Sequence, residues 1–170
     1  MKIIENSDFT KSTYRERLVE HLFVGELLRH LWLRGVHDVE VLKPAVAHSG
    51  YDLVLEYHQI IRHIELKASI VGGKRNAVTV NIGLQRVPSG CVIWVNVNPG
   101  DLGLRPFWWF GDEPHKPLPS IEEFQRGKQP RGTKRERENI RRIPRSKFIR
   151  LETVAEVAQK LFGEVAVEDV

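Results

Sequence analysis

The sequence has almost no cysteine, since Cys91 is the single one among 170 residues. One cysteine cannot close an intramolecular disulfide, and it excludes a metal site built from several thiolates. No apolar run approaches the roughly 20 residues that a membrane-spanning helix needs. The first residues also contain no apolar stretch of the kind found in secretory signals. We therefore expect a protein of the reducing cytoplasm that does not bind membranes.

Several motifs of known chemistry are also missing. There is no GxSxG nucleophile motif and no dinucleotide fingerprint, and the GGK at 72–74 lacks the spacing of a phosphate-binding loop. The seven histidines show no zinc-like spacing. What is present is an ordinary globular composition, 41% hydrophobic and 28% charged, which predicts a single domain over residues 1–170.

Positive charge is concentrated in one segment, residues 126–150. Eleven Lys and Arg stand there against two Glu, a local charge of +9, whereas the whole chain carries +4. A basic segment on a mildly acidic body is typical of polyanion binding, and nucleic acid is the commonest polyanion. A solvated loop without a ligand is the alternative. The residues expected to contact phosphates are Arg131, Lys134, Arg135, Arg141 and Arg142.

Hydrophobic periodicity predicts an α/β fold with a central mixed β-sheet flanked by helices. We expect a helix at 12–35, strands at 39–43, 51–57, 60–68, 91–97 and 106–111, and a short strand or helix through Leu84 and Gln85. This core, about 12–111, precedes a basic loop at 126–147 and a closing strand and helix over 147–163.

Three charged residues occupy unusual places in the two central strands. Asp52 begins one strand, and Glu65 and Lys67 come near the end of the next. In a hairpin that turns at residues 58–59, residue 57 faces 60 and Asp52 faces Glu65, with Cβ atoms about 5 Å apart. Lys67 shares the face of Glu65, because side chains repeat every second residue along a strand. A surface cluster of ion pairs at a sheet edge is the alternative interpretation.

Two adjacent carboxylates repel unless a cation lies between them. Mg²⁺, or Mn²⁺ as its substitute, suits Asp52 and Glu65 together with waters and a phosphate. A lysine beside that ion can orient a water molecule and offset charge on the transition state. The spacing therefore predicts a site that hydrolyses phosphodiesters.

The stretches GYDLVLE and HIELKAS resemble the core of the PD-(D/E)xK nuclease superfamily, with Asp52 as the first acid and Glu65-Leu66-Lys67 as the triplet. The similarity covers residues 20–97, and Gly50-Tyr51 stands where the family's proline would be. The resemblance implies a restriction-endonuclease-like fold and a further metal-binding acid on the first helix, Glu26, with Glu20 as second choice. It also implies a catalytic role for Gln85.

The predicted function is that of a Mg²⁺-dependent nuclease that acts on nucleic acid, with DNA favoured over RNA as its substrate. Lys74 and Arg75 follow the triplet and are expected to contact the scissile strand. By analogy with restriction enzymes, a homodimer is expected. Two alternatives stay open: a domain of this family that binds nucleic acid without cleaving it, and a protein-interaction module that uses the basic loop. For Glu26, pairing with a neighbouring arginine is the competing interpretation, and for Gln85 an ordinary polar position.

Overall fold

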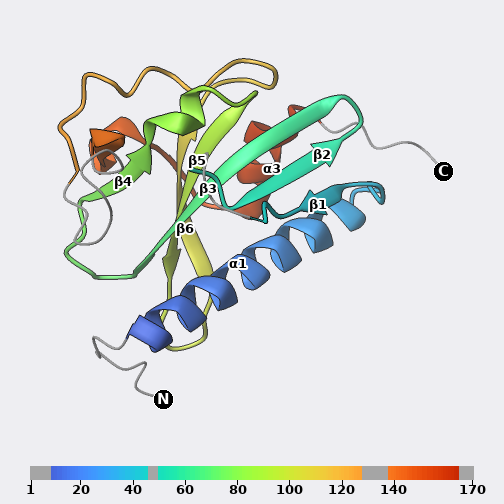
Figure 1. Ribbon diagram of the computed structural model, residues 1–170. Helices are drawn as coiled ribbons and strands as arrows, with labels where there is room; N and C mark the ends of the chain where they lie inside the picture. Colours follow the sequence, from blue (N-terminus) through green and yellow to red (C-terminus); the bar gives the residue numbers. More distant parts are fainter. Residues whose placement is uncertain (1–8, 46–49, 128–137, 165–170) are drawn as a thin grey trace.

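A central six-stranded sheet organises the molecule (Figure 1). The computed structural model describes residues 9–45, 50–127 and 138–164. In spatial order the strands are β1 (Glu40–Leu42), β2 (Leu53–Tyr57), β3 (Ile60–Ile70), β5 (Gly90–Val97), β6 (Leu104–Gly111) and β8 (Ile149–Leu151). β3 and β5 run parallel and the other neighbours antiparallel. The expected central mixed sheet is confirmed.

Two helices cover one face of this sheet. α1 (Phe9–Trp32) buries a stripe of side chains at four-residue spacing, namely Val19, Phe23, Leu27 and Leu31. α3 (Val154–Phe162) contributes Val157, Ala158, Leu161 and Phe162 to the same core. Figure 1 shows the length of α1 in blue, running past the strands. Alternate residues of the strands pack against both helices, as a sheet with two different faces requires.

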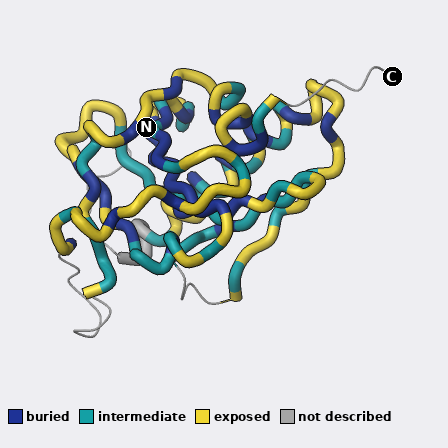
Figure 2. Tube along the Cα trace, turned by 90° about the horizontal axis from the view of Figure 1, so that it is seen from above, coloured by how far each residue is buried: buried dark blue, intermediate teal, exposed yellow. Residues whose placement is uncertain are grey.

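A second, smaller layer covers the other face. β4 (Ala77–Asn81) pairs with β7 (Ile140–Pro144) in a two-stranded sheet. The short 3₁₀ helix η1 (Ile82–Gln85) follows β4, and a second one, η2 (Arg145–Lys147), follows β7. Val80, Trp94 and Ile143 are fully buried in the core between this layer and the sheet. Figure 2 shows the buried positions running through the centre of the molecule.

The predicted register of the central hairpin is confirmed. Tyr57 pairs with Ile60 and Leu53 with Ile64, so Asp52 comes opposite Glu65. His58 accommodates the two-residue turn with a positive φ of 52°, although histidine is not a preferred residue for such turns.

The prediction of a basic loop over 126–147 is wrong for its last part. Residues 140–144 form β7, and 145–147 form η2. β7 is stabilised by pairing with β4, more than sixty residues away in the sequence, and by the fully buried Ile143. A local hydrophobic pattern could not reveal so distant a partner. Residues 128–137, which include Arg131, Lys134 and Arg135, lie outside the described residues.

The remaining boundaries shift by a few residues. α1 begins at Phe9 and ends at Trp32, three residues before Gly35, whose φ of +80° stops the helix. The closing segment forms η2, β8 and α3, with α3 ending at Gly163. None of the helices in the described part of the chain is long and apolar enough to cross a membrane.

Candidate active site

Asp52 is held in place by the strand opposite. Its backbone amide donates to the carbonyl of Ile64 at 2.8 Å, and its Oδ2 accepts a hydrogen bond from the amide of Leu66 at 2.7 Å. Burial raises the pKa of Asp52, an effect that the Leu66 amide and the Lys67 charge oppose and that Glu20 and Glu16 reinforce. A half-buried carboxylate is thus fixed through its Oδ2.

Glu65 is a buried carboxylate with an unsatisfied oxygen. The residue is only 7% exposed, and its Oε2 has no hydrogen-bond partner among the described residues. Burial raises the pKa of Glu65 to about 7, and the Asp52 charge adds to the rise, while Lys67 and the Asn81 backbone amide oppose it. A buried, unpaired carboxylate oxygen is unfavourable for folding alone.

Lys67 lies beside Glu65 on the same face of β3. Its Nζ is 2.5 Å from Oε1 of Glu65, and about a quarter of its side chain remains exposed. The three residues that the sequence singled out therefore lie together, with Asp52 and Lys67 both acting on the charge of Glu65.

A cleft of about 400 Å³ opens at this cluster. Asp52 and Lys67 line it from the central sheet, and Thr79 from β4. α1 contributes Glu16 and Glu20 to the wall. The cleft thus brings together the hairpin, the first helix and the small second sheet.

The helical acid at the cleft is Glu20, which the sequence ranked second, and not Glu26. Glu26 is absent from the cleft wall, because six residues carry it about 9 Å farther along the helix axis and to another side. Glu20 points in the direction of the buried stripe of α1, and its carboxylate forms an ion pair with Lys43. The acids that face the cleft could be predicted better from the four-residue spacing of Glu16 and Glu20. This spacing puts both on the side of the helix that carries Phe23 and Leu27.

Gly50 is a site-supporting residue that the sequence did not identify as functional. Its φ is +75°, and a Cβ added there would lie 2.6 Å from Cβ of Asn81. Asn81 is the residue whose backbone amide acts on Glu65. Only glycine therefore permits this close approach between the turn that leads into Asp52 and the end of β4.

Gln85 makes a structural contact and does not line the cleft. Its side-chain oxygen accepts a hydrogen bond from the backbone amide of Ile121 at 2.8 Å, which fastens the segment after β6 to η1. Gln85 is not among the residues that line the cleft. The ordinary polar role that was the alternative for this residue is the one its geometry supports.

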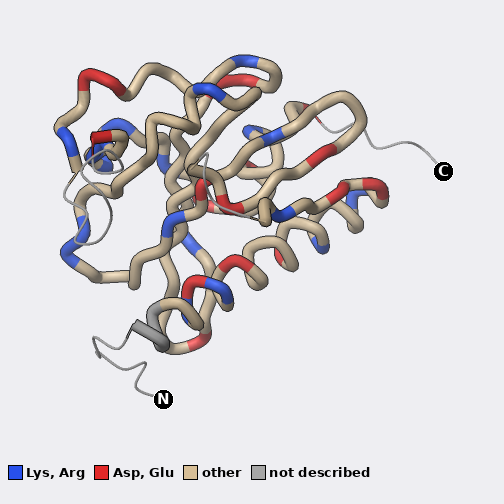
Figure 3. Tube along the Cα trace, in the orientation of Figure 1, with Lys and Arg blue, Asp and Glu red and all other residues tan. Residues whose placement is uncertain are grey.

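The predicted phosphate-binding residues differ in their surroundings. Arg75 lines the cleft and donates to the carbonyl of Ala68 at 3.1 Å, and Lys74 beside it is exposed. Arg142 is exposed and donates to Oδ1 of Asn76. Arg141 instead directs its donors at the backbone carbonyls of Glu122, Glu138 and Ile140, so it fastens a loop. Figure 3 shows several Lys and Arg positions on the side that carries β4.

The donor set suits a hard divalent cation. Within the described residues no three His, Cys, Asp or Glu side chains form a ready-made metal cluster. Asp52 and Glu65 nevertheless offer two opposed carboxylates, one with a buried oxygen that lacks a partner. Two carboxylates completed by waters and a substrate phosphate are a common arrangement for Mg²⁺, so the residues fit this ion.

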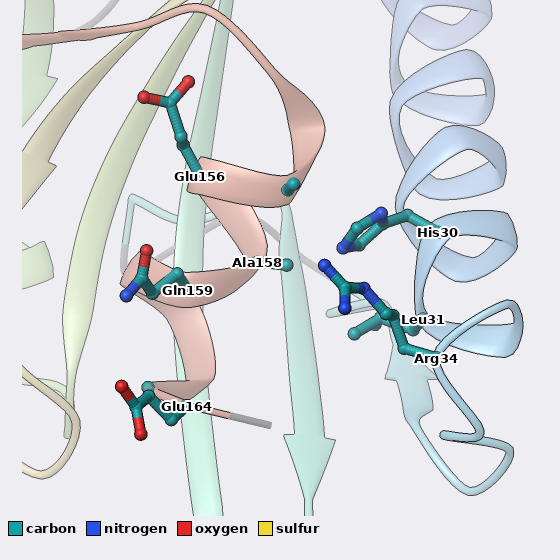
Figure 4. Close-up of a pocket in the computed structure, with 9 residues that line it drawn as sticks. His30, Leu31, Arg34, Glu156, Ala158, Gln159 and Glu164 are labelled. Carbon is teal, nitrogen blue, oxygen red and sulfur yellow. The ribbon is translucent and has the colours of Figure 1, made fainter. Parts of the chain in front are cut away.

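A second hollow, of about 500 Å³, lies between α1 and α3. His30 and Arg34 point from α1 toward α3, whereas Glu156, Gln159 and Glu164 extend away from them (Figure 4). Glu156 is engaged in the amino-terminal cap of α3, where it accepts from the amides of Glu152 and Thr153. The polar groups do not converge on a common point, so this hollow has no active-site geometry.

No protein-family model and no curated protein matches the chain. Among solved structures, the Holliday junction resolvase Hjc of Archaeoglobus fulgidus is similar, with a TM-score of 0.41 and 18% sequence identity. The match covers 78% of this chain and 96% of Hjc. In its D-then-ExK motif the chain resembles the PD-(D/E)xK superfamily.

Proposed function

We propose that the protein is a divalent-metal-dependent phosphodiester hydrolase that acts on nucleic acid, with DNA favoured over RNA as its substrate. One observation carries the proposal: Asp52 and Lys67 line the cleft, and the carboxylate of Glu65, opposite Asp52 and paired with Lys67, is buried with one oxygen that has no hydrogen-bond partner among the described residues. Most buried polar groups in folded proteins have a hydrogen-bond partner, and a bound cation is one explanation for a buried carboxylate oxygen that lacks one.

In this proposal Asp52 and Glu65 hold the ion, and Glu20, which lines the same cleft as Asp52, assists them. When bound, Mg²⁺ neutralises the two carboxylates, polarises the phosphate and lowers the pKa of a bound water. The Leu66 amide keeps the Asp52 carboxylate oriented through its hydrogen bond to Oδ2. A pre-oriented carboxylate does not have to lose conformational freedom when the substrate arrives.

Lys67 faces the same cleft with an ammonium group that is partly exposed. We assign it two tasks: to orient the attacking water and to stabilise the negative charge that grows on the phosphate oxygens. An electrostatic group of this kind contributes roughly 10²–10⁴-fold in rate. Arg75 at the cleft rim is assigned to a phosphate of the bound strand.

The test is a cleavage assay with labelled linear, nicked and single-stranded DNA and with RNA, each with Mg²⁺, Mn²⁺ or EDTA. Asp52→Asn and Glu65→Gln should abolish cleavage, because each removes an anionic ligand without changing the side-chain shape. Lys67→Ala should slow the chemical step by about 10²–10⁴-fold while metal binding persists. Glu56→Gln, an acid of β2 outside the cleft, is the matched control and should cleave normally.

Two outcomes would overturn the proposal. If the wild-type protein binds nucleic acid but cuts none of the substrates with either metal, the binding-only alternative replaces it. If it neither binds nor cuts, the protein-interaction alternative is favoured, since the basic segment then serves a different acidic partner.

A further inference from the structure

A row of side chains crosses the central sheet from the candidate cleft toward the β8 edge. Lys67 pairs with Trp94, Trp94 with Trp108, and Trp108 with Arg150. Directly paired residues point to the same face of a sheet, so all four side chains, that of Lys67 included, lie on one face. At about 4.8 Å per strand, the backbone of Arg150 lies roughly 14 Å from that of Lys67.

Two guanidinium groups lie over the ring of Trp108. Cζ of Arg145, in η2, is 5.3 Å from the ring centroid, and Cζ of Arg150 is 5.7 Å away. Arg145 also lies 5.9 Å from the ring of Trp94. Stacking on an aromatic ring fixes a guanidinium but leaves its N–H donors free at the edges. We call Trp108, Arg145 and Arg150 the arginine–tryptophan step.

The charge of this step is only partly neutralised. Among the residues that the structure describes, Arg145 forms no ion pair with a carboxylate, and Arg150 uses only Nε for Glu152, at 2.6 Å. Nearby along the chain, Lys147 is exposed as well. The side chain of a half-buried arginine held on a ring without an acid partner is ready for an external anion.

The step is connected to the cleft through the small second sheet. The amide of Arg145 donates to the carbonyl of Asn76 at 2.8 Å, and the side chain of Arg142 donates to Oδ1 of the same residue. Asn76 directly follows Arg75, which lines the cleft. Basic groups therefore continue from the cleft, through Arg75 and Arg142, to the arginine–tryptophan step.

We propose that the arginine–tryptophan step binds backbone phosphates of the same nucleic-acid strand whose scissile phosphate enters the candidate cleft. This inference rests on the proposed function. The roughly 14 Å between Lys67 and Arg150 exceeds the reach of a small anion, but it spans several nucleotides of a strand that rises 3.4 Å for each one. Because both guanidiniums stack on Trp108, the ring serves to position them and does not stack on a base.

The experiment measures binding of fluorescein-labelled duplex and single-stranded DNA in EDTA, where no cleavage occurs, over a range of salt concentrations. The variants are Arg145→Gln, Arg150→Gln and their combination. Each should weaken binding by about tenfold at moderate salt, and the double variant should lower the salt slope by about 2, since each phosphate contact contributes about 0.9. Arg145→Lys keeps the charge but loses the stacked fork, so its affinity should be intermediate.

The matched control is Lys160→Gln, which removes an exposed charge from α3 on the opposite side of the sheet. It should change neither affinity nor slope, and thermal melting should show every variant folded. If the wild type binds DNA but the double variant binds with unchanged affinity and slope, or if Lys160→Gln weakens binding equally, the inference is wrong while the proposed function stands. Competition by polyglutamate as strong as that by DNA would also overturn it. A wild type that binds no nucleic acid would overturn both.

Discussion

Among single residues, Glu65 is the one on which the proposed cation site depends most. Its carboxylate is buried between Lys67 and Asp52, and its pKa is raised to about 7, chiefly by burial. A folded-state pKa above the ordinary value of 4.5 means that the folded protein holds the proton more tightly than the unfolded chain. Stability without metal should therefore fall as the pH rises from about 4.5 through 7.

The substitution Glu65→Gln removes this charge while keeping the shape of the side chain. In EDTA at pH 8 it should raise the free energy of unfolding by about 1–3 kcal/mol, because the ionised carboxylate no longer has to be buried. Near pH 4.5 the gain should largely disappear, since the wild-type residue is then protonated in the folded state. Denaturant unfolding at both pH values measures the difference.

The control for this measurement is Glu56→Gln, at a half-buried acid of the same hairpin. The Glu56→Gln variant should have a free energy of unfolding within about 0.5 kcal/mol of wild type. A Glu65→Gln variant that is less stable than wild type at pH 8 would contradict this expectation, because Glu65 would then be a stabilising member of an ion pair with Lys67.

At the scale of elements, Arg62 of β3 joins three parts of the fold. It is fully buried, and its Nε and Nη2 donate at 2.7 Å to the carbonyls of Leu161 and Lys160 in the last turn of α3. Nη2 also donates to the carbonyl of Asp112, after β6, at 3.1 Å. A guanidinium thus satisfies carbonyls at the end of α3 that the helix itself cannot satisfy.

Arg62→Met should lower the free energy of unfolding by about 2–4 kcal/mol, since it leaves buried carbonyls without donors. Arg62→Lys should recover only part of this loss, because one ammonium cannot reach the same carbonyls as a planar fork. Urea unfolding monitored by circular dichroism provides the values. Arg29→Met, at an exposed position of α1, should be within about 0.5 kcal/mol of wild type. A comparably small effect of Arg62→Met would show that α3 is held by its apolar face alone.

The β2–β3 hairpin can be predicted from the sequence and the pairing of β4 with β7 cannot, for a physical reason. The hairpin register of β2 and β3 depends on a two-residue turn and on alternation, both of which are local, so Asp52 could be placed opposite Glu65 correctly. The pairing of β4 with β7 depends on partners far apart in the chain. In the sequence, Arg62 has no feature that distinguishes it from other charged residues in strands. Their roles become visible only when the elements come together.

At the scale of the whole molecule, the cleft depends on how α1 crosses the sheet. The stripe of buried residues on α1 sets the rotation of the helix about its own axis, and this rotation places Glu20 at the site. The average apolarity of the helix does not set it. Asp52, Glu65 and Lys67, predicted as the hairpin part of the site, lie together in the fold, and their role there stays a prediction. Glu26 and Gln85 are not among the residues that line the cleft. The contacts between layers that decide such positions have no signature in the local pattern.

We propose that Asp52 and Glu65 together hold a divalent cation. The most direct measurement is anomalous diffraction from crystals soaked with Mn²⁺, using wild-type protein and Glu65→Gln under the same conditions. We expect an anomalous peak within coordinating distance of both carboxylates in the wild type, and its loss in the variant. A well-diffracting wild-type crystal with Mn²⁺ bound elsewhere and no peak at this pair would contradict it.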